Sequence, residues 1–116
     1  MRDFAQMSAE AIVTAGGFDC DCGKRHETGL KYLKIGAGAV KKLPEALRML
    51  GVTRPFLVMD ENTRRAGYAQ VAAELRAAGL PFAECTLKGA HIEPDEHAVG
   101  ALLFAFDPAC DGVVGI

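Results

Sequence analysis

Residues 55–60, Pro-Phe-Leu-Val-Met-Asp, are the stretch that decides the fold. The run from Pro55 to Met59 is short, continuous and apolar, which is typical of a parallel strand covered on both faces. Asp60 stands at the carboxyl end of that run, and open parallel sheets bind ligands beyond the carboxyl ends of their strands. We therefore predict a buried strand that carries a carboxylate at its ligand-binding end.

Strands and helices are predicted to alternate on both sides of this stretch. Further strands are expected over 30–35, 81–87 and 112–116, separated by segments with helical periodicity. Strands that alternate with helices of this length imply a parallel sheet with right-handed crossovers. The predicted fold class is α/β, with helices flanking a parallel sheet.

Capping and turn-forming residues mark the ends of the first two of these helices. Pro44 is tolerated only near a helix start, so the first regular helix is expected to begin there and to close at Gly51. Asp60 or Asn62 could cap the second helix. That helix is expected to run to about residue 78 and to end at Gly79.

The third helix is expected to start at Pro94, with Asp95 and Glu96 in its first turn, where acids favour the helix dipole. Its apolar residues fall at helical spacing and predict a stripe buried against the sheet. The stripe comprises Val99, Leu102, Leu103 and Phe106.

The N-terminal region has a different character. Ser8 can cap a short helix that ends at Gly16-Gly17, and residues 18–27 predict a hairpin or tight loop. We therefore divide the chain into 1–29, a helix with a Cys/His-containing hairpin, and 30–116, an incomplete α/β domain. Because the last predicted strand has no covering helix after it, we expect the chain to be a fragment of a longer protein.

Composition excludes several classes of function. The 116 residues are 50% hydrophobic and carry a net charge of −2, and the basic residues form no long run, which argues against nucleic acid as a partner. No stretch approaches the roughly 20 apolar residues that span a bilayer, and the N-terminus lacks a signal peptide. We expect a cytoplasmic protein without a membrane span, in which a disulfide framework is not expected.

Gly36-Ala37-Gly38, together with Asp60 at the end of the next predicted strand, partly matches the dinucleotide-binding fingerprint. Glycines let the backbone approach a phosphate, and the carboxylate can accept hydrogen bonds from both hydroxyls of an adenosine ribose. The third fingerprint position is Lys41 instead of glycine. A tight turn is the alternative role of the two glycines, and helix capping is an alternative or additional role of Asp60.

The run from Cys20 to His26, Cys-Asp-Cys-Gly-Lys-Arg-His, brings three zinc-ligand side chains together in sequence. A structural zinc site needs four ligands, so Cys85 or His91 would have to supply the last from far along the chain. The alternative is a tight turn whose cysteines pack as small hydrophobes. Asp21 between the thiols is expected to raise their pKa.

Polar residues before and within the third predicted helix are further candidates for ligand contact. His91 and Glu93 fall in the loop after strand 81–87, at the ligand-binding edge of the predicted sheet, and could contact a cofactor or substrate. His97 is expected on a solvated face.

Three runs stand out together: residues 34–47 (KIGAGAVKKLPEAL), 56–63 (FLVMDENT) and 110–116 (CDGVVGI). In their order and spacing they resemble sn-glycerol-1-phosphate dehydrogenases, relatives of glycerol dehydrogenases, iron-containing alcohol dehydrogenases and dehydroquinate synthases. The segment 18–26 (FDCDCGKRH) is similar to one in bacterial members of the glycerol-1-phosphate branch. The resemblance covers about residues 18–116.

This resemblance implies that the chain is the N-terminal part of a two-domain, NAD- or NADP-dependent dehydrogenase. Residues 30–116 are then its Rossmann-like nucleotide-binding domain, which is incomplete. It implies that Asp60 binds the adenosine ribose with Asn62 and Thr63 beside it, and that Gly115 is the first glycine of the phosphate-binding loop. Gly36 and Gly38 then become a structural turn. The implied catalytic metal, zinc, nickel or iron, is held by an Asp and two His of the C-terminal domain, so no metal ligand or catalytic residue is carried over to this chain.

The implied substrate is a small phosphorylated polyol or ketone, with dihydroxyacetone phosphate reduced to glycerol 1-phosphate in a homo-oligomeric enzyme. The fragment alone is expected to be inactive. Two alternatives stay open: a self-contained α/β binding domain with a zinc site at Cys20, Cys22 and His26, and a fragment of a dehydroquinate synthase-like lyase.

Overall fold

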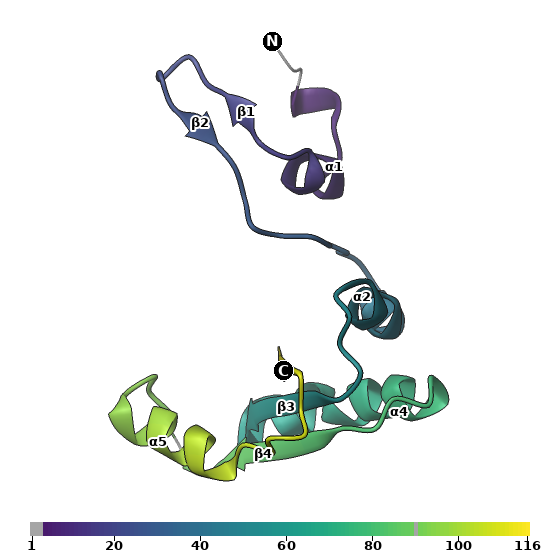
Figure 1. Cartoon of the computed structure of the whole chain (residues 1–116), viewed down its shortest axis with the longest axis vertical. Coiled ribbons are helices and arrows are strands. Elements are labelled where there is room, and N and C mark those ends of the chain that lie inside the picture. The colour runs from purple at the N-terminus through teal and green to yellow at the C-terminus, as the bar shows by residue number, and fades with distance from the viewer. Residues whose placement is uncertain (1–3, 90) are drawn as a thin grey trace. The chain divides into compact units, whose positions relative to one another are not determined.

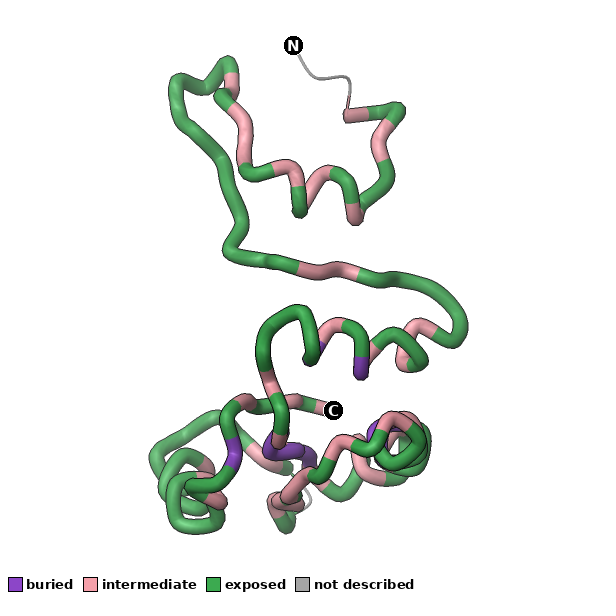
Figure 2. The backbone as a smooth tube through the Cα atoms, turned by 45° about the vertical axis from the view of Figure 1, so that its right-hand side comes forward, coloured by how far each residue is buried: buried purple, intermediate pink, exposed green. Residues whose placement is uncertain are grey.

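The computed structural model describes residues 4–89 and 91–116 and divides the chain into two units, Met1–Ala39 and Val40–Ile116 (Figure 1). The division between residues 29 and 30 stays a prediction. Among the described residues of the first unit none is buried, so the hydrophobic core belongs to the second unit (Figure 2).

The first unit consists of short helices and a hairpin. A 3₁₀ turn (Phe4–Gln6) precedes α1 (Ala9–Thr14), whose predicted cap is confirmed because Ser8 Oγ accepts from the Ala11 N–H at 3.1 Å. Strands β1 (Phe18–Asp19) and β2 (Arg25–His26) pair antiparallel and form the predicted hairpin.

The strand predicted over 30–35 is wrong, because these residues form neither a helix nor a strand. Leu30 and Ile35 are 50% and 64% exposed. Alternating side chains satisfy only one requirement of a strand, since its backbone also needs a neighbouring strand to pair with. The sheets among the described residues pair other segments and leave 30–35 without such a neighbour.

The second unit is built on a parallel sheet with the order β4-β3-β5. Strand β3 (Pro55–Asp60) lies in the centre, paired with β4 (Ala83–Leu87) and β5 (Gly112–Gly115). The predicted strand at 55–60 and the α/β fold with a parallel sheet are confirmed.

Helices connect these strands. A 3₁₀ turn (Ala39–Lys42) leads into α2 (Leu43–Met49), and β3 is followed by α3 (Glu61–Thr63), a π-helical segment (Arg64–Tyr68) and α4 (Ala69–Ala77). Helix α5 (Glu96–Ala105) precedes β5. None of the described helices is long and apolar enough to cross a membrane.

Two glycines end helices as predicted. Gly51 and Gly79 have φ of +74° and +68°, the left-handed conformation that glycine adopts without a Cβ penalty. After each of them the next N–H, of Val52 or Leu80, bonds back into the last helical turn at 2.9 Å. These terminations turn the chain into β3 and towards β4.

The core fills one face of the sheet. Leu57 and Met59 of β3, at most 2% exposed, pack with residues of α2 and α4. Because strand side chains alternate between faces, Phe56 and Val58 point to the other side. The core cluster comprises Leu47, Leu57, Met59, Val71 and Leu75.

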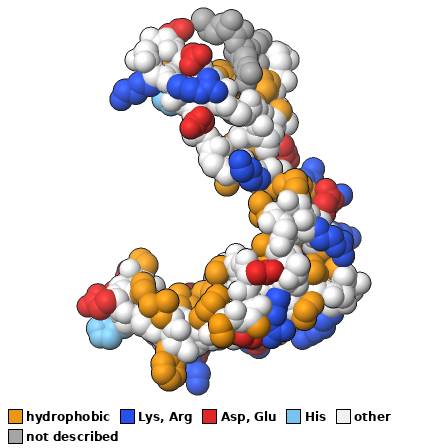
Figure 3. Space-filling view, viewed as in Figure 1, with side chains coloured by type: hydrophobic (Ala, Val, Ile, Leu, Met, Phe, Trp, Pro, Cys, Tyr) orange, Lys and Arg blue, Asp and Glu red, His pale blue; other side chains and the backbone are white. Residues whose placement is uncertain are grey.

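The opposite face is covered less completely, and here the predicted buried stripe of the third helix is wrong. Val99, Leu103 and Phe106 are 52%, 74% and 39% exposed. Helix α5 begins at Glu96 instead of Pro94. Figure 3 shows hydrophobic side chains on its surface, and an apolar pocket of about 320 Å³ opens between α5 and the sheet. Helical periodicity finds an apolar stripe but does not show whether enough structure lies over it.

Candidate functional site

The carboxyl ends of the strands form one edge of the sheet, because all the strands run parallel. Asp60 pairs in register with Leu87 of β4, and Val58 pairs with Gly115 of β5. The Ile116 N–H extends the β5 pairing by donating to the Val58 carbonyl at 3.0 Å. Asp60 and Gly115 therefore lie at the same edge, as the alternation of strands and helices requires.

Asp60 ends β3 and caps α3. Its Oδ1 accepts from the backbone N–H groups of Asn62 (2.8 Å) and Thr63 (2.7 Å). The hydrogen bond from the Thr63 N–H is the largest influence that holds the pKa of Asp60 below its ordinary value, so the carboxylate is ionised at neutral pH. Both of these hydrogen bonds are accepted by Oδ1.

The side chains of Thr63 and Asn62, beside Asp60, also form hydrogen bonds within the helix start. Thr63 Oγ1 accepts from the Asp60 N–H at 3.1 Å and completes a capping box. Asn62 is exposed, and its Oδ1 accepts from the Arg65 guanidinium. The three side chains expected at the ribose are therefore held together by one helix start, although capping alone would require this arrangement of Asp60 and Thr63.

The end of β5 lies against the π-helical segment that follows β3. An added Cβ at Gly67 would come within 3.0 Å of Ile116 Cγ2, so glycine permits this close approach. Gly115 is exposed beside this contact, and Ile116 packs against the core. A π-helical turn is often found at functional sites, and here it lies where the two strand ends meet.

Sequence reasoning missed the role of Arg64. Its Nη1 donates to Glu84 Oε1 (3.0 Å) and Thr86 Oγ1 (3.1 Å) of β4, and its guanidinium lies 4.2 Å from the centroid of the Tyr68 ring. Arg64 thus fastens the π-helical segment to the sheet. No local signal identifies this role, because its partners are distant in sequence.

A second missed cluster lies at the opposite, amino-terminal edge. The Asp111 carboxylate accepts from the backbone N–H groups of Thr53 and Arg54 and from Thr53 Oγ1 at 2.7–3.1 Å. The Thr53 hydroxyl is the largest influence that lowers the pKa of Asp111, to about 2. This clamp joins the starts of β3 and β5 and supports the register in which the two strands pair.

His91 and Glu93 line a pocket of about 240 Å³ beyond the carboxyl end of β4. Lys88 and His97 also line it, and the His97 side chain is 87% exposed, as predicted. The pocket is at the same edge of the sheet as Asp60, because Leu87 pairs with Asp60. A contact of His91 or Glu93 with cofactor or substrate stays a prediction.

The partial fingerprint at Gly36 is not formed. The strand expected directly before these glycines, at 30–35, is not formed, and the Ala39 N–H donates to the Gly36 carbonyl at 3.1 Å, which closes a turn. Gly36 and Gly38 have φ of +135° and +74°. They form the structural turn that the resemblance implies.

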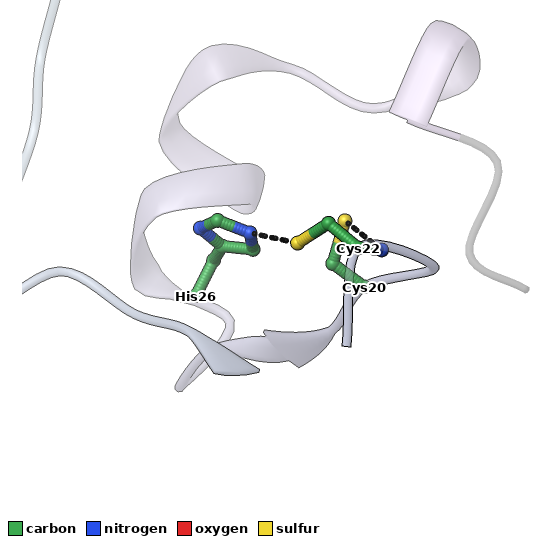
Figure 4. A group of neighbouring side chains, drawn as sticks. All are labelled: Cys20, Cys22 and His26. Carbon is green, nitrogen blue, oxygen red and sulfur yellow. Dashed lines mark hydrogen bonds between the residues drawn. The ribbon is translucent and has the colours of Figure 1, made fainter. Parts of the chain in front are cut away.

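The first unit brings together the Cys/His group that the sequence singled out (Figure 4). Within the described residues, one ligand atom from each of Cys20, Cys22 and His26 lies within 4.8 Å of the others. Cys22 Sγ is 3.2 Å from His26 Nε2. Cys20 is half-buried, whereas Cys22 and His26 are exposed, so a solvent ion can reach the group.

The expected effect of Asp21 on the Cys20 thiol is wrong. The Cys22 N–H points at Cys20 Sγ at 3.5 Å, and this backbone hydrogen bond is the largest influence on Cys20, lowering its pKa. A backbone donor aimed at sulfur stabilises the thiolate, and the charge of Asp21 does not reverse that effect.

The chain is similar to a glycerol-1-phosphate dehydrogenase [NAD(P)+] from Halalkalibacterium halodurans, with 34% identity over 89 residues. The match covers 73% of this chain but only 22% of the length of that protein. No protein-family model matches the chain, and no solved structure matches it.

Proposed function

We propose that this chain forms the nucleotide-binding N-terminal part of an NAD(P)-dependent dehydrogenase. The observation that carries the proposal is the placement of Asp60 and Gly115 at one edge of a parallel sheet. The similarity to a dehydrogenase with an NAD(P)+ cofactor supports it. When bound, the cofactor supplies or accepts hydride, and the residues of this chain bind and orient its adenosine half.

In this proposal Asp60 Oδ2 accepts hydrogen bonds from the ribose hydroxyls, while Oδ1 keeps capping the helix. Asn62 and Thr63 line the same position, and Gly115 allows the backbone to approach the pyrophosphate. The Asp60 carboxylate repels a 2′-phosphate. Arg64, a nearby cation, already forms an ion pair with Glu84 and does not offset that repulsion. We therefore propose that NAD binds more tightly than NADP.

The proposal assigns turnover to a longer protein, because the dehydrogenase is matched over only 22% of its length. That activity is the reduction of a small phosphorylated ketone, dihydroxyacetone phosphate, to glycerol 1-phosphate. The metal ligands implied by the resemblance lie outside this chain, so no step is assigned to a metal here. A homo-oligomeric state and a cytoplasmic location remain predictions.

Titration of the ¹⁵N-labelled 116-residue chain with ADP-ribose, followed by NMR, tests the site. We expect weak binding with amide shifts centred on residues 60–63 and on Gly115, and weaker binding of 2′-phospho-ADP-ribose. Shifts confined to the pocket around His91, or none at millimolar ligand, would contradict the proposal.

Asp60→Asn and Asp60→Ala form a matched pair. Asn is as good a helix cap as Asp, so Asp60→Asn keeps the fold and removes the charge. We expect it to weaken ADP-ribose binding several-fold and to narrow the preference against the 2′-phosphate. Asp60→Ala also removes the cap, so a loss of binding seen only with Asp60→Ala would assign a structural role alone.

A further inference from the structure

We propose that Cys20, Cys22 and His26 bind a zinc ion through both thiolates and the imidazole Nε2, with the fourth coordination position open to water. This site lies in the first unit and does not depend on the proposed nucleotide site. Three ligand atoms already converge there.

The distances suit a tetrahedral ion. Zinc bonds of about 2.3 Å to sulfur and about 2.0–2.1 Å to nitrogen put a sulfur and a nitrogen about 3.6 Å apart, and two sulfurs about 3.8 Å apart. Cys22 Sγ and His26 Nε2 are 3.2 Å apart, and all three ligand atoms lie within 4.8 Å of one another. Small rotations of these side chains, two of which are exposed, are therefore enough to close them around zinc.

The hairpin turn positions the thiols. The Cys20 N–H bonds to the Lys24 carbonyl at 3.0 Å, and the Gly23 N–H bonds back to the Cys20 carbonyl at 2.9 Å. Gly23 has φ of +80°, which a three-residue hairpin loop of this kind requires. The turn brings Cys22 back over the hairpin, where Cys20 and His26 already lie.

Aromatic packing orients the imidazole. His26 pairs with Phe18 across the hairpin, and their rings stack with centroids 5.4 Å apart. Phe4 in turn packs against Phe18, with ring centroids 4.5 Å apart. The imidazole is thus supported from one side while Nε2 faces Cys22.

The first unit also has a physical need for such an ion. It spans Met1–Ala39, and none of its described residues is buried. Units below about 40 residues usually require disulfides, metals or oligomerisation to hold one structure. All four cysteines are free, so coordination can provide the cross-link that the hydrophobic core does not.

The donor set selects the metal class. Two thiolates and an imidazole suit zinc, whereas magnesium and calcium prefer oxygen ligands. Binding displaces the thiol protons, so affinity should fall as pH is lowered. Within the described residues, no fourth Cys, His, Asp or Glu joins this group.

Metal analysis of the 116-residue chain, produced with added zinc and purified without chelator, is the first test. We expect about one zinc per chain, and Co²⁺ in its place should give a thiolate-to-cobalt charge-transfer band and the visible bands of a tetrahedral ion. Zinc far below stoichiometric together with no charge-transfer band would overturn the proposal.

Variants identify the ligands. Cys20→Ser, Cys22→Ser and His26→Ala should each weaken zinc binding at least about 10-fold, since losing a group that only orients a ligand already costs that much. Cys85→Ser and His97→Ala are the matched controls and should leave binding unchanged. Loss of zinc with Cys85→Ser but not with Cys22→Ser would place the ion elsewhere and overturn the assignment.

A rescue variant separates ligation from folding. His26→Cys supplies a third thiolate and should retain zinc, with a stronger charge-transfer band in the cobalt form. NMR signals of residues 40–116 should be unchanged in the variants of Cys20, Cys22 and His26. A His26→Cys chain that keeps these signals but binds no metal would contradict a role of position 26 as a ligand.

Discussion

The two units of this chain contain similar helix caps and turns but differ in how far their residues are buried. Each has a capped helix, through Ser8 in the first unit and Asp60 in the second. In the second unit Leu57 and Leu75 are fully buried, whereas none of the described residues of the first is. Caps and turns set local geometry, but burial of apolar surface is the main source of stability. A bound zinc ion would give the first unit a source of stability that the core gives the second.

The largest expected effect comes from the centre of the sheet. Leu57 is 0% exposed, so Leu57→Ala leaves a cavity in the core. The change should lower the free energy of unfolding of the second unit by about 2–5 kcal/mol. Urea unfolding measures this loss. Leu103→Ala, at a site 74% exposed, is the control and should change stability by less than about 0.5 kcal/mol. Equal effects of the two changes would mean that the core is not where the structure places it.

Two glycines of the second unit should give opposite results. Gly79→Ala places a residue with a Cβ in the left-handed conformation and should lower the free energy of unfolding by about 1 kcal/mol. Gly100→Ala lies within α5, where an added Cβ meets nothing within 4 Å, and should stabilise by about 0.5–1 kcal/mol. Thermal unfolding of both variants measures these changes, and destabilisation by Gly100→Ala would show that α5 is packed more tightly than described.

Acid should weaken the second unit through the clamp at Asp111. Hydrogen bonds from Thr53 and Arg54 lower the pKa of its carboxyl from 3.8 to about 2. The contribution of the clamp is therefore complete above pH 3.8 and is lost as pH falls towards about 2. Urea midpoints across this range should fall with pH. Asp111→Asn should be less stable at neutral pH and show a shallower pH dependence, and an unchanged dependence would assign it to other carboxyls.

The smallest effect on overall unfolding should come from the first unit. Gly16 and Gly17 both have positive φ, but a Cβ at Gly17 would also lie 2.8 Å from Glu27 Cβ and 2.9 Å from the His26 carbonyl. Gly17→Ala should therefore displace the hairpin and weaken zinc binding more than Gly16→Ala does. Unfolding of residues 40–116 should not change. Zinc titration of both variants tests this, and equal affinities would mean that the hairpin tolerates the clash.

Some features could be read from the sequence because their causes are local. The continuous apolar run ending at Asp60 predicted the central strand, Gly51 and Gly79 predicted helix ends, and residues 18–27 predicted the hairpin. Each depends on the conformational preferences of a few neighbouring residues, which a single chain displays directly. The convergence of Cys20, Cys22 and His26 belongs here too, since a short turn joins them.

Other features depend on what lies nearby in space. Residues 30–35 alternate like a strand but have no neighbouring strand to pair with, and α5 has an apolar stripe that the sheet covers only in part. The link from Arg64 to β4 and the clamp at Asp111 join residues distant in sequence. Local pattern alone determined which segments could become helix, strand or turn. Tertiary structure decided which of them found a partner, because pairing and burial require surfaces that other parts of the chain supply.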